Sequence, residues 1–160
     1  MKQIKSFILA LLLIFTFTSY TFASNQNQPN LSQIYKNNDG SYIIVNIITI
    51  ESKDSYNANS SMSTKSGTKN YSFYNSKSEL QWIVSIHGTF NYNGSTSNCI
   101  KSSASSQLIN STWKVKEAVA SRRNNSAIGD FVVKHYMLGV PVQTKDVQLT
   151  LTCSPNGTLS

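Results

Sequence analysis

Apolar and polar residues alternate along most of this chain, and the clearest alternation is in Leu80–Tyr92. Trp82 and Val84 fall on one side of that segment, and Ser85 and His87 fall on the other. A period of two places alternate side chains on opposite faces of a β-strand. The pattern therefore predicts a strand with one buried face and one polar face.

Other short segments repeat this pattern, and turn residues separate them. No segment after residue 23 shows the 3.6-residue apolar stripe of a helix. These features predict an all-β domain with hairpins around 75–78 and 137–141. The fold is either an antiparallel β-sandwich (immunoglobulin-like or similar) or a small barrel, and we favour the sandwich. Residues 51–67 fit either an irregular edge strand or a loop. The predicted strands are 41–50, 68–74, 80–92, 99–108, 112–120, 127–136 and 140–153.

The first 23 residues have the features of a secretory signal peptide. Lys2 and Lys5 precede the apolar run Phe7–Phe17, and we expect cleavage between Ala23 and Ser24. A transmembrane anchor would need about 20 mostly apolar residues, and the residues after position 17 are too polar to supply them. The chain thus divides into a signal peptide (1–23), a polar N-terminal segment (24–40) and a β-sandwich domain (41–160). The expected location is outside the cell, with or without loose attachment to the cell wall.

Positive charge is spread thinly along the chain. Without Lys2 and Lys5 the formal net charge falls from +7 to +5, and the only adjacent basic pair is Arg122 and Arg123. A nucleic-acid-binding protein usually gathers its cations on one face or helix, so nucleic acid is not an expected partner. The expected partners are anionic cell-envelope polymers or another protein, with no membrane span after signal removal.

The only two cysteines are Cys99 and Cys153. In a short exported chain, two cysteines most simply form one disulfide. The closed loop of about 55 residues would contribute about 4 kcal/mol of stability in the chain-entropy view. The alternatives are a reactive thiol, which needs a nearby base, and a metal site, which needs three or four ligands. The sequence predicts the disulfide Cys99–Cys153, no metal and no cofactor.

No catalytic residues are predicted. A glycosidase needs two carboxylates on either side of one bond, and the spacing of the acidic residues pairs none of them. His135, Asp130 and a serine could be drawn as a triad, but no nucleophile-elbow motif supports it. His87 lies on the polar side of its predicted strand. The protein is therefore expected not to be an enzyme. The seven acidic residues are Asp39, Glu51, Asp54, Glu79, Glu117, Asp130 and Asp146.

Aromatic residues raise the possibility of carbohydrate binding, because sugars stack on exposed rings. Trp82 and Trp113 lie on apolar faces, where a sandwich core normally buries such rings. A ligand, if one binds, would meet loops or an open face. The tyrosines favoured for exposure are Tyr42, Tyr56, Tyr74 and Tyr136.

Residues 70–99, Trp113 and the closing LTLTCSPNGTLS at 149–160 resemble small secreted β-rich proteins of Gram-positive, clostridial-type bacteria, a domain family of unknown function. The resemblance covers about 68–160 and implies a secreted β-rich domain with one disulfide and no assigned activity. Function is therefore expected to be a non-catalytic interaction outside the cell or at the cell envelope. The alternatives are a glycan binder and an antagonistic or adhesin-type protein, and no ligand-binding residue is assigned.

Overall fold

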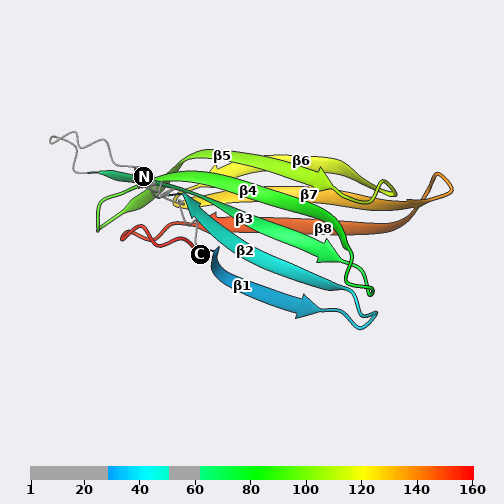
Figure 1. Ribbon diagram of the computed structural model, residues 1–160. Helices are drawn as coiled ribbons and strands as arrows, with labels where there is room; N and C mark the ends of the chain where they lie inside the picture. Colours follow the sequence, from blue (N-terminus) through cyan, green and yellow to red (C-terminus); the bar gives the residue numbers. More distant parts are fainter. Residues whose placement is uncertain (1–28, 51–61) are drawn as a thin grey trace, which may run out of the picture.

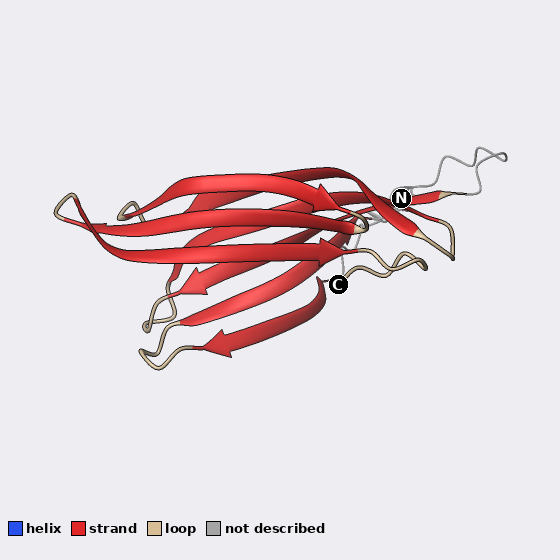
Figure 2. Cartoon of the chain, turned by 180° about the vertical axis from the view of Figure 1, so that it is seen from behind, coloured by secondary structure: helices blue, strands red, loops and turns tan. Residues whose placement is uncertain are grey.

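The computed structural model describes residues 29–50 and 62–160. The predicted signal peptide, the cleavage site at Ala23–Ser24 and Tyr56 lie outside the described residues. All regular structure in the described part is β-strand, as predicted (Figure 2). The strands are β1 (Pro29–Lys36), β2 (Tyr42–Ile50), β3 (Ser63–Tyr74), β4 (Leu80–Tyr92), β5 (Ser97–Leu108), β6 (Trp113–Arg123), β7 (Ser126–Met137) and β8 (Val140–Thr152).

The strands form two antiparallel sheets in which spatial order follows chain order. One sheet has the order β1-β2-β3-β4-β5, and the other has the order β6-β7-β8 (Figure 1). This confirms the prediction of two-faced antiparallel strands. The order is a meander, whereas an immunoglobulin domain has Greek-key connections. This protein therefore shares the packing of two antiparallel sheets with an immunoglobulin domain but has different strand connections.

One apolar core lies between the two sheets and carries the alternation predicted from the sequence. On β4, Trp82, Val84 and Ile86 are fully buried, while His87 is half-buried on the other face. The core side chains of β7 and β8 come from the opposite sheet. The largest fully buried residues are Trp82, Phe90, Phe131, Ile86, Leu151, Val84, Val133 and Cys153.

Two strands extend beyond the predicted ones. β1 lies in the segment 24–40, which the sequence predicts to be polar and outside the sandwich, yet it pairs with β2 at the edge of the larger sheet. β3 begins at Ser63, inside the segment left open as strand or loop, and is paired on both sides. Backbone pairing places both segments in the sheet, although neither has a strong apolar alternation.

The five-stranded sheet is wider than the sheet that covers it. β8 packs against β3 and β4, whereas β1 and β2 contact no strand of the three-stranded sheet among the described elements. β1 and β2 therefore overhang the sandwich, as Figure 1 shows. The backbone of the overhang has no strand of the other sheet close to it, although the Ile47 side chain of β2 is buried in the core.

The hairpin links gather at opposite ends of the strands. The links β1–β2, β3–β4, β5–β6 and β7–β8 lie at one end, named here the tip end, where the β7–β8 hairpin extends farthest (Figure 1). The links β4–β5 and β6–β7 and the residues after β8 lie at the other end, named the cysteine end because Cys99 and Cys153 lie there.

Candidate functional site

The β7–β8 hairpin carries exposed apolar side chains around its turn. Leu138 and Gly139 make the two-residue turn with φ angles of 50° and 82°, and Met137 pairs with Val140 across it. The side chain of Leu138 is 100% exposed, and Met137, Val140 and Val142 are more than half exposed. We call these four residues, Met137, Leu138, Val140 and Val142, the apolar tip.

The neighbouring β5–β6 link adds two more apolar side chains at the same end. Leu108 and Ile109 are exposed there. The backbone N–H of Tyr136 donates to the carbonyl of Thr112 at 2.8 Å, which joins this link to the β7–β8 hairpin. Contiguous exposed apolar patches on soluble domains usually mark an interaction site. The tip end therefore presents apolar surface from two adjacent hairpins.

Three lysines lie on the outer face of β6 and β7 behind the apolar tip. Lys114 pairs directly with Lys134 across the two strands. The Nζ atoms of Lys114 and Lys116 lie 5.0 Å and 5.5 Å from the centroid of the Tyr136 ring. We call Lys114, Lys116 and Lys134 the lysine cluster.

The acidic residues of this face lie farther from the tip. Asp130 accepts a hydrogen bond from Gln148 Nε2 at 2.7 Å. Val132 of β7 pairs with Glu117 of β6 on one side and with Asp146 of β8 on the other. The outer face of the small sheet thus runs from apolar tip to cations and then to anions. Such an arrangement can bind a layer that has an apolar interior and anionic groups at its surface.

A polar cleft of about 340 Å³ opens at the tip end between the two sheets. Asn110 Nδ2 donates to Gln81 Oε1 at 2.8 Å, and the rings of Trp113 and His135 stack with centroids 4.7 Å apart. Asp39 accepts hydrogen bonds from the hydroxyl and the backbone N–H of Ser41, and these bonds lower the pKa of its carboxyl group. The cleft therefore offers amides, one carboxylate and aromatic edges.

The structure does not assemble the His135–Asp130 pair considered from the sequence. His135 is stacked on Trp113 in the cleft, whereas Asp130 lies on the outer face and bonds to Gln148. His87 Nδ1 lies 3.1 Å from Thr68 Oγ1 on the outer face of the large sheet. In the described part of the chain no group of three or more metal-ligating residues comes together. His135 and Asp130 therefore lie on opposite faces of the small sheet.

Trp82 and Trp113 are buried, which confirms that both belong to the core. Three of the tyrosines favoured for exposure are half-buried. Tyr42 and Tyr74 stack on each other with centroids 4.7 Å apart and planes nearly parallel, and Tyr136 lies under the lysines. These rings are already occupied by protein neighbours, so they present no open stacking platform.

The predicted disulfide is not formed, and this corrects the expectation for Cys99 and Cys153. Both are buried free thiols. Cys99 Sγ lies 3.2 Å from the carbonyl oxygen of Lys101, and Cys153 Sγ lies 3.4 Å from that of Ser154. Burial raises the pKa of both thiols. Alternation correctly placed both side chains inward, but facing inward does not bring two sulfur atoms together.

The two cysteines flank the same link at the cysteine end. The N–H of Cys99 donates to Asn124 O at 2.8 Å, and the N–H of Cys153 donates to Asn125 O at 3.0 Å. Each cysteine backbone is therefore held on a neighbouring residue of the β6–β7 link. The Ser97 hydroxyl of β5 also donates to the carbonyl of Cys153, so hydrogen bonds join the ends of β5 and β8 here.

Sequence reasoning missed the apolar tip, because MLGVP at 137–141 predicts only a hairpin link with a strand from Val140 onward. A signal was present: a two-residue hairpin turn favours Asn-Gly or Asp-Gly, whereas this chain has Leu-Gly between apolar neighbours. The described residues include no helix long and apolar enough to cross a membrane.

The resemblance to secreted clostridial-type proteins stays a prediction. No family model matches this chain, and no curated protein and no solved structure matches it either.

Proposed function

We propose that this protein is a non-catalytic extracellular module that attaches to anionic lipid surfaces of a cell envelope through its tip end. The apolar tip enters the headgroup region, and the lysine cluster lies against the lipid phosphates. The expected export of the chain and its positive net charge support this location and partner.

The observation that carries the proposal is the fully exposed Leu138 at a φ of 50°. A non-glycine residue in the left-handed region costs about 1–2 kcal/mol. Folding gains nothing from this leucine, because its side chain packs on no part of the described protein. Burying a leucine side chain yields about 1.5–3 kcal/mol, so transfer into lipid would offset the backbone cost.

The lysine cluster supplies the matching charge. Lys114 and Lys134 occupy directly opposite positions on β6 and β7, so two positive charges lie side by side there. A lysine near an anionic membrane surface contributes about 1 kcal/mol, and this contribution weakens as salt is added. An apolar tip with cations behind it is the arrangement of surface-binding amphipathic elements.

Co-sedimentation with lipid vesicles tests the proposal. We expect binding to vesicles that contain phosphatidylglycerol and weaker binding to vesicles of phosphatidylcholine alone. Leu138→Asn keeps a residue that tolerates the left-handed turn and should lower binding about tenfold. The matched control is Val119→Asn, because Val119 is exposed on β6 away from the turn. Equal binding by both variants would refute attachment through the tip.

Glycan binding remains the second candidate, favoured by the polar cleft. Gln81, Asn110 and Asp39 offer the amides and carboxylate that hydrogen-bond sugar hydroxyl groups. Trp113 lines the cleft, so its fluorescence should report a bound glycan. Titration with peptidoglycan fragments tests this candidate: a saturable change that Asn110→Ala abolishes would support it, and an unchanged spectrum would count against it.

A further inference from the structure

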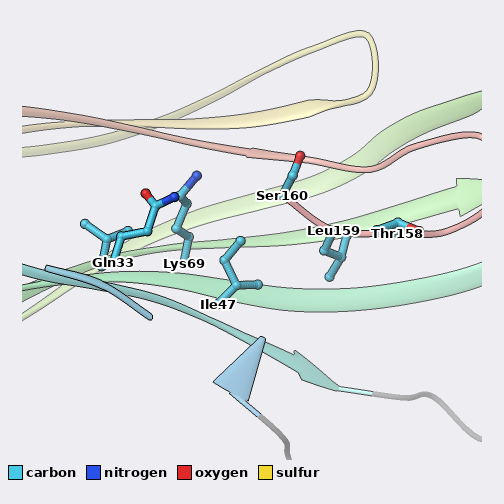
Figure 3. A pocket seen from close by; sticks show the side chains of 7 residues that line it. Gln33, Ile47, Lys69, Thr158, Leu159 and Ser160 are labelled. Carbon is cyan, nitrogen blue, oxygen red and sulfur yellow. The ribbon is translucent and has the colours of Figure 1, made fainter. Parts of the chain in front are cut away.

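A groove of about 480 Å³ lies under the overhang of β1 and β2, away from the tip end. Its apolar wall comes from Val45 and Ile47 of β2 and from Leu159, which follows β8. Figure 3 shows Gln33, Ile47 and Lys69 on the strands of the large sheet, with Leu159 and Ser160 on the segment that follows β8. The volume falls within the range of small-molecule sites, about 300–1,000 Å³.

Among the residues that the structure describes, Lys69 is the only cation that lines this groove, and it is half-buried. Its Nζ donates to the backbone carbonyl of Thr150 at 3.0 Å. An ammonium group has three N–H donors, so this bond leaves two of them for another acceptor. Partial burial lowers the pKa of Lys69, and no described acidic group acts against this effect.

A partly buried charge normally has a partner of opposite sign. Lys69 has an apolar wall on one side and a single neutral carbonyl as its acceptor. An anion seated in the groove would accept the remaining N–H groups, and Gln33 and Thr158 could donate or accept further hydrogen bonds at its rim. An apolar chain attached to that anion would lie against Val45 and against the small exposed parts of Ile47 and Leu159.

We infer that this groove binds a small amphiphilic carboxylate, with its carboxylate on Lys69 and its apolar chain against β2 and Leu159. The strands explain why the space exists. β1 and β2 extend past the three-stranded sheet, so no strand of the second sheet lies close to the region that they cover. This site is separate from the apolar tip, and neither proposal depends on the other.

Isothermal titration of the purified protein with decanoate, below the concentration at which it forms micelles, tests the inference. We expect one site per chain and no binding of decyltrimethylammonium, which has the same chain and the opposite charge. Lys69→Met should weaken decanoate binding about tenfold or more, because it removes charge-assisted hydrogen bonds. Lys69→Arg should retain most of the affinity.

Three controls keep the outcome clear. Lys101→Met removes an exposed lysine of β5 outside the groove and should leave binding unchanged. Leu138→Asn should also leave it unchanged, which separates this site from attachment by the tip. Val45→Trp should block the groove, with folding checked by near-ultraviolet circular dichroism. No binding by the unmodified protein, or equal binding by Lys69→Met, would overturn the inference.

Discussion

Lys114 and Lys134 lie directly opposite each other on β6 and β7. Like charges paired across strands destabilise a sheet by a few tenths to about 1 kcal/mol. The Tyr136 ring stabilises the Lys114 ammonium group through a cation–π contact, with Lys114 Nζ 5.0 Å from the ring centroid. A charge pair that weakens the sheet is consistent with selection for an anionic partner.

Replacing one member of that pair should separate stability from binding. We expect Lys134→Gln to raise the free energy of unfolding by about 0.2–1 kcal/mol, because it removes the repulsion with Lys114. The same variant should bind anionic vesicles several-fold more weakly. Chemical denaturation and vesicle co-sedimentation measure the two effects. A loss of stability together with unchanged vesicle binding would contradict this role for the pair.

The turn at Leu138 should show the same trade-off more strongly. We expect Leu138→Asn to raise the free energy of unfolding by about 1 kcal/mol, because asparagine tolerates a positive φ better than leucine does. Thermal and denaturant unfolding measure this change. If Leu138→Asn instead lowered the free energy of unfolding, the leucine would contribute to the stability of the fold. Its exposure would then no longer indicate a binding partner.

The core is expected to reject a methyl group at Gly88. A Cβ atom there would lie 2.5 Å from Cζ of Phe90 and 3.0 Å from Cβ of Ala127. We expect Gly88→Ala to cost about 1–3 kcal/mol of stability through overpacking. Adding Phe90→Leu should recover part of that loss by freeing space, although the smaller side chain has its own cost. Denaturant unfolding of both variants measures this coupling, and strictly additive losses would contradict the predicted clash.

The thiols offer a direct test of the corrected cysteine assignment. With Cys99 and Cys153 buried and their pKa values raised, neither should react with a thiol reagent in the native protein near pH 7. Two thiols should react after denaturation. Because the folded-state pKa values are raised, these groups should also lower stability as the pH rises above about 9. Finding no thiol under denaturing conditions would show a disulfide and contradict the structure.

The sequence predicted the parts of the fold that depend on alternation. β4 was recognisable because its inward residues, among them Trp82 and Val84, are all apolar. β1 was not, since an edge strand can be held by its backbone bonds while side chains such as Ile34 and Tyr35 stay exposed. The pairing of cysteines failed for a related reason, because a period of two gives the face of a residue but not the distance to a residue on another strand.

The candidate sites were less predictable than the fold. Leu138 and its neighbours were assigned to a turn, and only the observed exposure shows that nothing in the described protein covers them. The groove at Lys69 depends on the different widths of the two sheets, a property of the whole assembly of strands. The unusual Leu-Gly turn is a local signal for the apolar tip, whereas the groove at Lys69 cannot be obtained from local sequence.

The most direct test of attachment through the tip end is the depth that the β7–β8 turn reaches in a membrane. Leu138→Trp places an indole at the turn, against a background from Trp82 and Trp113, which stay buried in the core. Anionic vesicles should shift its emission to shorter wavelength, and lipids brominated in their acyl chains should quench it. Emission unchanged by vesicles, with no quenching by the brominated lipids, would contradict the account.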